Sequence, residues 1–197
     1  GLAAKDGRLT ALRTNRGQVE SNACILAVGH SARDVYAMLL GEGVALLPKP
    51  FAVGVRVEHP QEVIDKAHCG AMAGHARLGA AEYHLTAKSG GRGVYTFCMC
   101  PGGQVVASSS EEGTVVTNGM SRHARDGQNA NAAVVVQVGP EDFGSNPLGG
   151  VEFQRRMERT AFAASGDYRA PAETVGDFLA GRDRPKGFGA VVPSYRP

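Results

Sequence analysis

Residues 23–34 read ACILAVGHSARD, and the prediction of the fold starts from this stretch. Its apolar run, Cys24 to Val28, has the length and composition of a buried central strand in a parallel sheet. Gly29 then permits a sharp turn, and Ser31 is a favourable N-cap for a helix that we expect to end near Leu40. The stretch therefore predicts a strand, a tight turn and the start of a helix.

Turns of this kind bind ligands in open α/β sheets, because the carboxyl end of the strand meets the free backbone N–H groups of the next helix. The candidate binding residues at this turn are Gly29, His30 and Ser31. The alternative interpretation is an ordinary strand-to-helix turn that contacts no ligand.

Short antiparallel strands precede the turn. Segments 2–4, 9–14 and 18–20 are separated by Lys5-Asp6-Gly7 and Asn15-Arg16-Gly17, and Asp-Gly is a strong hairpin signal. After the predicted helix, Pro48-Lys49-Pro50 interrupts the pattern, since proline fixes φ and restricts the residue before it. We therefore predict a domain boundary there, with residues 1–47 in one domain and residues 48–197 in a second.

The second domain has the pattern of an α+β fold, with a mostly antiparallel sheet and two or three helices. Residues 51–58 alternate between an apolar face and a face that carries Gly54 and Arg56, which predicts a strand. Further strands are expected at residues 81–87, 93–99, 104–108, 114–117 and 132–138, with turns at Pro101-Gly102-Gly103 and Asn118-Gly119. Helices are expected at residues 61–67, with Pro60 as the first helical residue and Val63 and Ile64 inward, and at residues 151–164 and 174–179, before a tail at 182–197 without periodicity.

The composition excludes several classes of protein. The 197 residues are 43% hydrophobic and 20% charged, which is ordinary globular usage, and the net charge of +2 comes without a basic block, so no nucleic-acid partner is predicted. No apolar run approaches the roughly 18 residues of a membrane span, so no membrane association is expected. Four cysteines are too few for a disulfide scaffold and predict reduced thiols in the cytoplasm.

Two of the cysteines form a C-x-C motif at the end of a predicted strand. Side chains two apart on a strand share a face, so Cys98 and Cys100 are expected to point the same way, as a redox dithiol or half a metal site requires. No second cysteine pair and no paired-histidine motif complete a metal site, so none is predicted. Half-buried structural thiols are the alternative, because free cysteines are commonly buried.

A cationic loop follows, at residues 120–131. Arg122 and His123 are candidates for binding an anionic substrate or a cofactor phosphate. A solvated surface loop is the alternative, since charged side chains are mostly exposed. In the preceding turn, Gly102 and Gly103 leave the backbone accessible to a flat ligand such as a flavin.

Four longer stretches carry a resemblance that covers most of the chain. They are CILAVGHSARD (24–34), KPFAVGVRVEHPQ (49–61), YTFCMCPGG (95–103) and TNGMS (117–121). Together they resemble the bacterial family of uncharacterised FAD-dependent dehydrogenases. The resemblance implies the two-part FAD-binding fold of glutathione-reductase-like flavoproteins with an inserted domain. Residues 1–47 would then be part of the FAD-binding domain, and residues 48–197 the inserted α+β domain on the substrate side.

The resemblance also implies roles for the candidate residues. Gly29, His30, Ser31, Gly102 and Gly103 would contact FAD, and Arg122 and His123 would contact an unidentified small-molecule substrate. The catalytic candidates are Cys98, Cys100 and His123, with a redox exchange between a thiol and the flavin as one hypothesis.

The family's amino-terminal strand with its pyrophosphate-binding glycine loop is not in this sequence, nor is its closing carboxyl-terminal segment. We therefore expect a fragment of a flavin-dependent oxidoreductase that, by itself, is inactive and binds FAD weakly or not at all. Its expected partners are the remainder of the parent flavoprotein and the substrate, with further copies of the chain left open. The alternative function is a non-catalytic α+β module for binding or dimerisation.

Overall fold

The computed structural model describes residues 1–182 and 187–195. It has the predicted α+β class, with antiparallel sheets and short helices. The residues cluster into two units: Gly1–Lys49 with Gly139–Phe153, and Pro50–Val138 with Gln154–Pro197. The first unit is called unit 1 below and the second unit 2.

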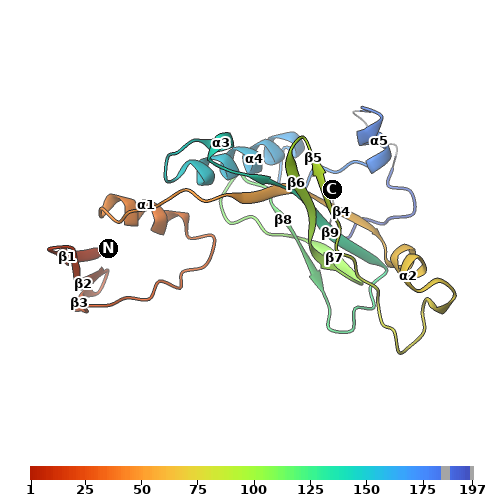
Figure 1. Ribbon diagram of the computed structural model, residues 1–197, viewed down its shortest axis with the longest axis horizontal. Helices are drawn as coiled ribbons and strands as arrows, with labels where there is room; N and C mark the ends of the chain where they lie inside the picture. The colour runs from red at the N-terminus through yellow and green to blue at the C-terminus, as the bar shows by residue number, and fades with distance from the viewer. Residues whose placement is uncertain (183–186, 196–197) are drawn as a thin grey trace. The chain divides into compact units, whose positions relative to one another are not determined.

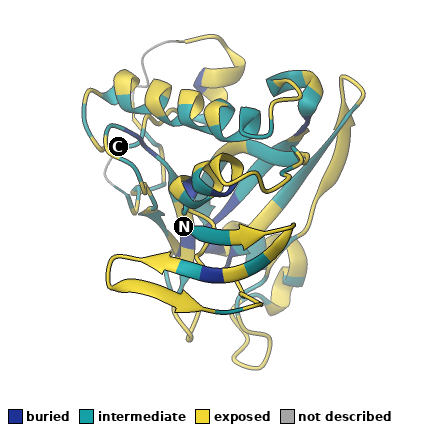
Figure 2. Cartoon of the chain, turned by 90° about the vertical axis from the view of Figure 1, so that its left-hand side faces the viewer, coloured by how far each residue is buried: buried dark blue, intermediate teal, exposed yellow. Residues whose placement is uncertain are grey.

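Unit 1 begins with a three-stranded antiparallel meander of β1 (Leu2–Lys5), β2 (Arg8–Thr14) and β3 (Gly17–Glu20), as predicted. Asp6 and Gly7 have φ values of 51° and 73° in the first turn, which suits the Asp-Gly pair. Figure 2 shows that most of the meander is exposed, apart from the buried Ala11 at its centre. The helices α1 (Arg33–Gly41) and α3 (Pro140–Phe143) also belong to this unit, as do the first residues of α4 (Gly149–Ser165), up to Phe153.

The prediction of a strand at Cys24–Val28 is wrong. These residues have no regular secondary structure, and Ile25 is 94% exposed. A strand needs a hydrogen-bonded neighbour, and no described strand pairs with this segment. The N-cap prediction is also wrong: α1 begins at Arg33 with Ala32 as N-cap, and no side chain caps it.

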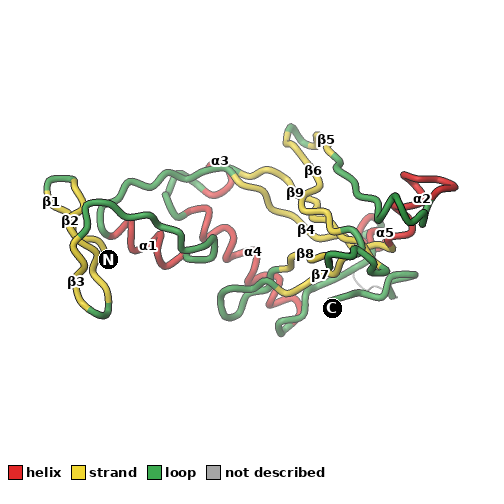
Figure 3. Tube along the Cα trace, turned by 90° about the horizontal axis from the view of Figure 1, so that it is seen from below, coloured by secondary structure: helices red, strands yellow, loops and turns green. Residues whose placement is uncertain are grey.

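Unit 2 is built on a four-stranded antiparallel sheet in the order β4-β9-β6-β5 (Figure 1). Its strands are β4 (Phe51–Pro60), β9 (Asn129–Val138), β6 (Arg92–Cys100) and β5 (Thr86–Ser89). The register of β4 and β9 is unbroken from Phe51 opposite Val138 to Pro60 opposite Asn129. The strands predicted at 51–58 and 132–138 are thus confirmed, and Figure 3 shows this long pair in yellow.

A second sheet pairs β7 (Gly103–Ala107) with β8 (Thr117–Ser121). The turn at residues 101–103 therefore connects β6 to β7, which belong to different sheets, and does not form a hairpin. Asn118-Gly119 lies inside β8 rather than in a turn, and residues 114–116 precede the strand. Long-range pairing with β7 has overridden the local turn signal, as tertiary contacts often do for β structure.

The helices of unit 2 lie close to their predicted positions, at α2 (Gln61–Cys69) and α5 (Val175–Leu179), with a short 3₁₀ turn, η1 (Gly70–Met72). The helix predicted at residues 151–164 lies within α4 (Gly149–Ser165). Pro60 is the N-cap of α2 rather than its first residue, and Val63 is 56% exposed rather than inward. The buried position of α2 is instead Gln61.

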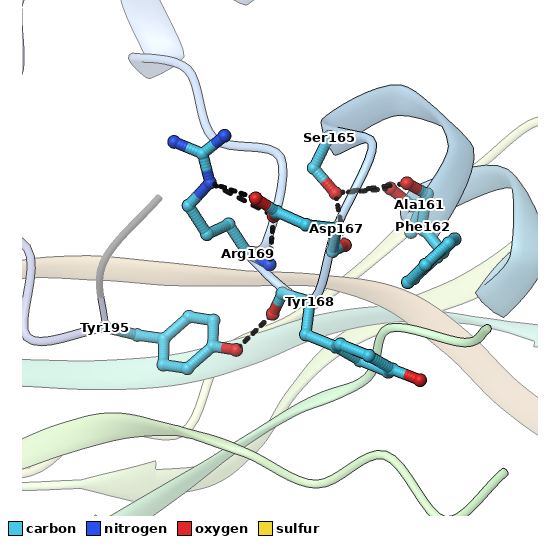
Figure 4. A network of polar contacts seen from close by, with 7 residues as sticks. All are labelled: Ala161, Phe162, Ser165, Asp167, Tyr168, Arg169 and Tyr195. Atoms are coloured by element: carbon cyan, nitrogen blue, oxygen red, sulfur yellow. Dashed lines mark hydrogen bonds and ion pairs between the residues drawn. The ribbon is translucent and has the colours of Figure 1, made fainter. Parts of the chain in front are cut away.

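The segment after α4 is fastened by polar contacts that Figure 4 shows. Ser165 Oγ donates to the carbonyl oxygens of Ala161 and Phe162 and to that of Asp167. The Tyr195 hydroxyl donates to the carbonyl oxygen of Tyr168. The aperiodic tail predicted at 182–197 includes residues 183–186 and 196–197, which lie outside those described. None of the helices in the described parts of the chain has the length and apolar content to cross a membrane.

Candidate functional site

A guanidinium lies where the two sheets of unit 2 meet. Arg56 projects from β4, and its Nη1 donates to Asn131 Oδ1 of β9 at 2.7 Å and to the carbonyl oxygen of Cys98 in β6 at 3.4 Å. Its Nη2 reaches Asn118 Oδ1 of β8 at 3.4 Å. We call Arg56, Cys98, Cys100, Asn118 and Asn131 the Arg56 cluster, because the guanidinium joins the four strands that contribute these residues.

The Arg56 cluster holds more hydrogen-bond donors than acceptors. Asn131 is fully buried, yet among the described residues its Nδ2 has no hydrogen-bond partner, and neither has the buried Nε of Arg56. Buried polar groups in folded proteins are nearly always paired, and leaving one unpaired costs about 1–3 kcal/mol. Two such donors on neighbouring side chains mark this cluster as the place in unit 2 where an acceptor is missing.

A β-bulge in β6 shapes the cysteine side of the cluster. Phe97 pairs with Ala133 and Cys100 with Asn131, so Cys98 and Met99 stand opposite the single residue Ala132. Cys98 takes the left-handed conformation, with φ 49°, which is uncommon for a residue other than glycine. The extra residue interrupts the alternation on which the C-x-C prediction depended. Cys98 is exposed and Cys100 is buried, rather than both facing alike.

The two thiols therefore have different chemistry. Burial raises the pKa of the Cys100 thiol, and the neighbouring Cys98 acts in the same direction, whereas Arg56 and Ser121 act against it. The net effect keeps Cys100 protonated at neutral pH, where its Sγ donates to the Cys98 carbonyl oxygen at 3.3 Å. A protonated thiol is a poor nucleophile, so Cys98 is the more accessible of the two for chemistry.

Gly119 of β8 is required by the packing of the cluster. A Cβ atom there would lie 2.2 Å from Asn131 Oδ1, 2.5 Å from Arg56 Nη1 and 2.8 Å from Cys100 Sγ. The absence of a side chain at this position thus lets three polar groups converge on one point of β8. Gly119 contributes to the site through this closeness, rather than through the turn that the sequence suggested.

The structure brings together two segments that were predicted to face the substrate. They are residues 98–103, called the cysteine turn below, and the cationic loop at residues 120–131. Gly127 N donates to the Gly102 carbonyl oxygen at 3.2 Å, and Ser121 Oγ donates to that of Pro101 at 2.8 Å. Gln61 fixes the turn from below, since its buried Oε1 accepts from Gly102 N at 2.8 Å. A hollow of about 730 Å³ lies beside Gln61, but the Arg56 cluster does not line it.

Close packing of the backbone explains why Gly102 and Gly103 are glycines, without any ligand. A Cβ on Gly102 would lie 2.1 Å from the Arg125 carbonyl oxygen, and one on Gly103 would lie 2.7 Å from that of Met120. The chain's own backbone thus fills the space that the sequence had suggested for a flat ligand. FAD contact by these two glycines stays a prediction.

Arg122 and His123 are exposed on the same loop. Within the part of the chain that the structure describes, neither side chain has a hydrogen bond or ion pair, so both stay available for an anion. The Gly29 turn belongs to unit 1. Gly29 has φ 83° with open space beside it, and Ser31 Oγ lies 3.4 Å from His30 Nε2. Across residues 1–182 and 187–195, no group of three His, Cys, Asp or Glu side chains is placed to hold a metal ion.

Residues 50–197, which include the whole Arg56 cluster, match the family model described as "FAD-dependent protein, C-terminal domain-like". The chain belongs to this family. It is also similar to a protein of Clostridium beijerinckii named "Uncharacterized protein", at 53% identity over 198 residues that cover 98% of the chain. The chain spans 37% of the length of that relative. The expected resemblance to an FAD-dependent family is confirmed at this level.

Two members of the Arg56 cluster were not considered as site residues from the sequence: Asn118 was interpreted as a turn residue, and Arg56 as one polar residue of an alternating strand. Asn131, at the start of a strand, was considered able to orient a ligand, with hydrogen bonding to the turn backbone as the alternative. A usable signal was present in β4, where a lone arginine shares a face with Gly54. A charged side chain next to a strand glycine indicates that another element packs closely there.

Proposed function

We propose that this chain forms the substrate-side part of a flavin-dependent oxidoreductase, with the Arg56 cluster, the cysteine turn and the cationic loop around the substrate. The observation that carries the proposal is the pair of buried donors without acceptors, Arg56 Nε and Asn131 Nδ2, inside the segment that matches the FAD-dependent family. Unsatisfied buried groups of this kind persist where function requires them.

The Gly29 turn fits the flavin side of this proposal. Within the part of the chain that the structure describes, a Cβ atom added to its left-handed glycine would meet nothing within 4 Å, and no side chain caps the following helix α1. Backbone N–H groups at such a helix start suit the phosphate groups of a dinucleotide. Gly29, His30 and Ser31 would therefore hold FAD in the parent protein. There the flavin would supply the redox chemistry by accepting the electron pair that the substrate loses.

The chain's own residues would orient the substrate and hold its protons. The guanidinium of Arg56 supplies a positive charge. The thiol of Cys100 beside it is protonated, so it carries no negative charge that would cancel this one. Cys98, Arg122 and His123 are exposed side chains of unit 2 that would lie around the substrate. Among these groups, His123 is the candidate for proton transfer to or from the substrate, because imidazole is the commonest general acid and base in enzymes.

The longer Clostridium beijerinckii relative provides the test. We expect the purified relative to retain FAD with visible flavin absorbance, and a substrate screen without oxygen to bleach that absorbance. The 197-residue chain by itself is expected to retain little or no flavin after gel filtration, because it spans only 37% of the length of that relative. A relative without flavin would overturn the proposal.

A non-catalytic binding module is the second candidate, and exposed apolar side chains favour it. Val55 of β4 is 67% exposed and Leu85, before β5, is 60% exposed. Between them in register lie the half-buried Val134 and Thr96, so this face carries exposed apolar side chains on either side of a half-buried middle. Two results together would favour this function. Light scattering would show a stable dimer that a Val55→Lys substitution dissociates into monomers, and the relative would contain no flavin.

A further inference from the structure

We propose that the Arg56 cluster is a binding site for a carboxylate. The catalytic meaning of this site, a substrate that carries a carboxylate, depends on the proposed function. The site itself does not depend on it, because every group involved lies in unit 2.

The first argument is uncompensated charge. All three oxygen atoms that Arg56 contacts belong to neutral groups: the amides of Asn131 and Asn118 and the Cys98 carbonyl. Across residues 1–182 and 187–195, no carboxylate lies within 4.0 Å of its guanidinium. Buried or half-buried charges in proteins are normally paired, since their desolvation is otherwise unopposed.

The nearby groups that could supply a negative charge are engaged or neutral. Glu58 is two residues along β4, but its carboxylate accepts from Asn129 Nδ2 at 2.9 Å and from Ser194 N at 3.2 Å. Cys100 holds its proton because burial outweighs the attraction of Arg56. The charge of Arg56 is therefore left for a group that comes from outside.

The second argument is the state of the hydrogen bonds. The bond to Asn131 is short at 2.7 Å, whereas those to Cys98 and Asn118 are at the long limit of 3.4 Å. Cys98 and Asn118 are also the exposed members of the cluster. An anion that arrives from their side would replace two weak contacts by charge-assisted bonds, which are roughly twice as strong as neutral ones.

A carboxylate suits this site better than a phosphate. The planar guanidinium matches the two oxygens of a carboxylate in a bidentate pair. One guanidinium balances one negative charge, and Arg125 of the neighbouring loop already faces Glu82 at 3.6 Å. The single guanidinium of Arg56 thus favours a monoanion.

The test follows the Nε–H signals of individual arginines by NMR while sodium acetate is added to the 197-residue chain at constant ionic strength. The Arg56 signal is expected to shift and saturate. Arg155 is the matched control, because its guanidinium already binds both carboxylate oxygens of Glu111, at 2.8 Å each for the shortest contacts. Its signal should stay in place.

Two substitutions at Asn118 sharpen the test without removing Arg56. Asn118→Asp places a carboxylate next to Nη2 and is expected to abolish acetate binding, since the site then carries its own anion. Asn118→Ala removes one weak contact and should keep acetate affinity within about threefold. Arg56→Gln, followed through the side-chain amide signal of Asn131, should weaken binding about tenfold or more, in line with the loss of a charged hydrogen bond.

Several results would overturn the carboxylate site. These are an Arg56 signal that does not move, parallel shifts of Arg56 and Arg155, or an equal shift with chloride. A response to phosphate but not acetate would also contradict it. Acetate binding to this chain together with a flavin-free relative would instead keep the site and overturn the proposed oxidoreductase function.

Discussion

At the scale of single residues, the two cysteines of the C-x-C motif should react at different rates. Cys98 is exposed, while Cys100 is buried with a raised thiol pKa. We expect iodoacetamide at neutral pH to modify Cys98 and Cys24 readily and to leave Cys100 largely unmodified, as measured by peptide mass spectrometry. Equal modification of Cys98 and Cys100 in the folded chain would show that the bulge does not separate them.

The same thiol makes stability depend on pH. A pKa that is higher in the folded state than in the unfolded chain means that the folded state holds the proton more tightly, so stability is lost as pH rises past the ordinary thiol value of 9.0. The free energy of unfolding in urea should stay level up to about pH 8 and fall as the pH rises above about 9. A Cys100→Ser variant should show a smaller fall. An unchanged fall would assign the effect to other groups, such as Tyr83, whose pKa burial also raises.

The bulge also marks the limit of residue-level prediction. The period of two is a property of a regular strand, and a single left-handed residue at Cys98 reverses its outcome for Cys100. Nothing in the local sequence CMC signals that insertion. Arg56 and Asn131 met only through the alignment of β4 with β9, which a single sequence does not specify.

At the scale of elements, the glycine in β8 is the sharpest test of how the sheets fit together. Gly119→Ala would push a methyl group against Asn131, Arg56 and Cys100, and overpacking of this kind costs about 1–3 kcal/mol. We expect the free energy of unfolding in urea to fall by that amount. Gly93→Ala in β6 is the control, because nothing lies within 4 Å of its Cβ position. A similar loss of stability in both variants would mean that close packing at Gly119 is not the cause of the loss.

Elements with a strong pattern were predicted well, and those decided by distant partners were not. The alternation at 51–58 and the valine-rich run at 132–138 gave β4 and β9, because β-branched residues suit a half-buried strand. Residues 24–28 have an equally apolar run but no strand beside them. Asn118-Gly119 has the composition of a turn, yet pairing with β7 keeps it extended.

At the scale of the whole molecule, protection from hydrogen exchange should follow the sheet topology. β9 lies between β4 and β6 and contains the buried residues Ala130, Asn131 and Ala132, whereas β3 is an edge strand with every residue exposed. Deuterium uptake measured by mass spectrometry should therefore be slowest in peptides from β9 and fastest in β3 and residues 22–32. Uptake in β9 as fast as in β3 would contradict this arrangement.

The exposed apolar run at Cys24–Val28 has a consequence for how the chain behaves in concentrated solution. Short β-prone, uncharged segments without a partner strand are the places where chains stack into aggregates. Ile25→Lys, at the most exposed position of the run, should lower light scattering at high concentration and leave the circular dichroism spectrum unchanged. Light scattering that persists in this variant would show that another surface is responsible for self-association. The same five residues that most resemble a core strand are thus expected to set the solubility of the chain.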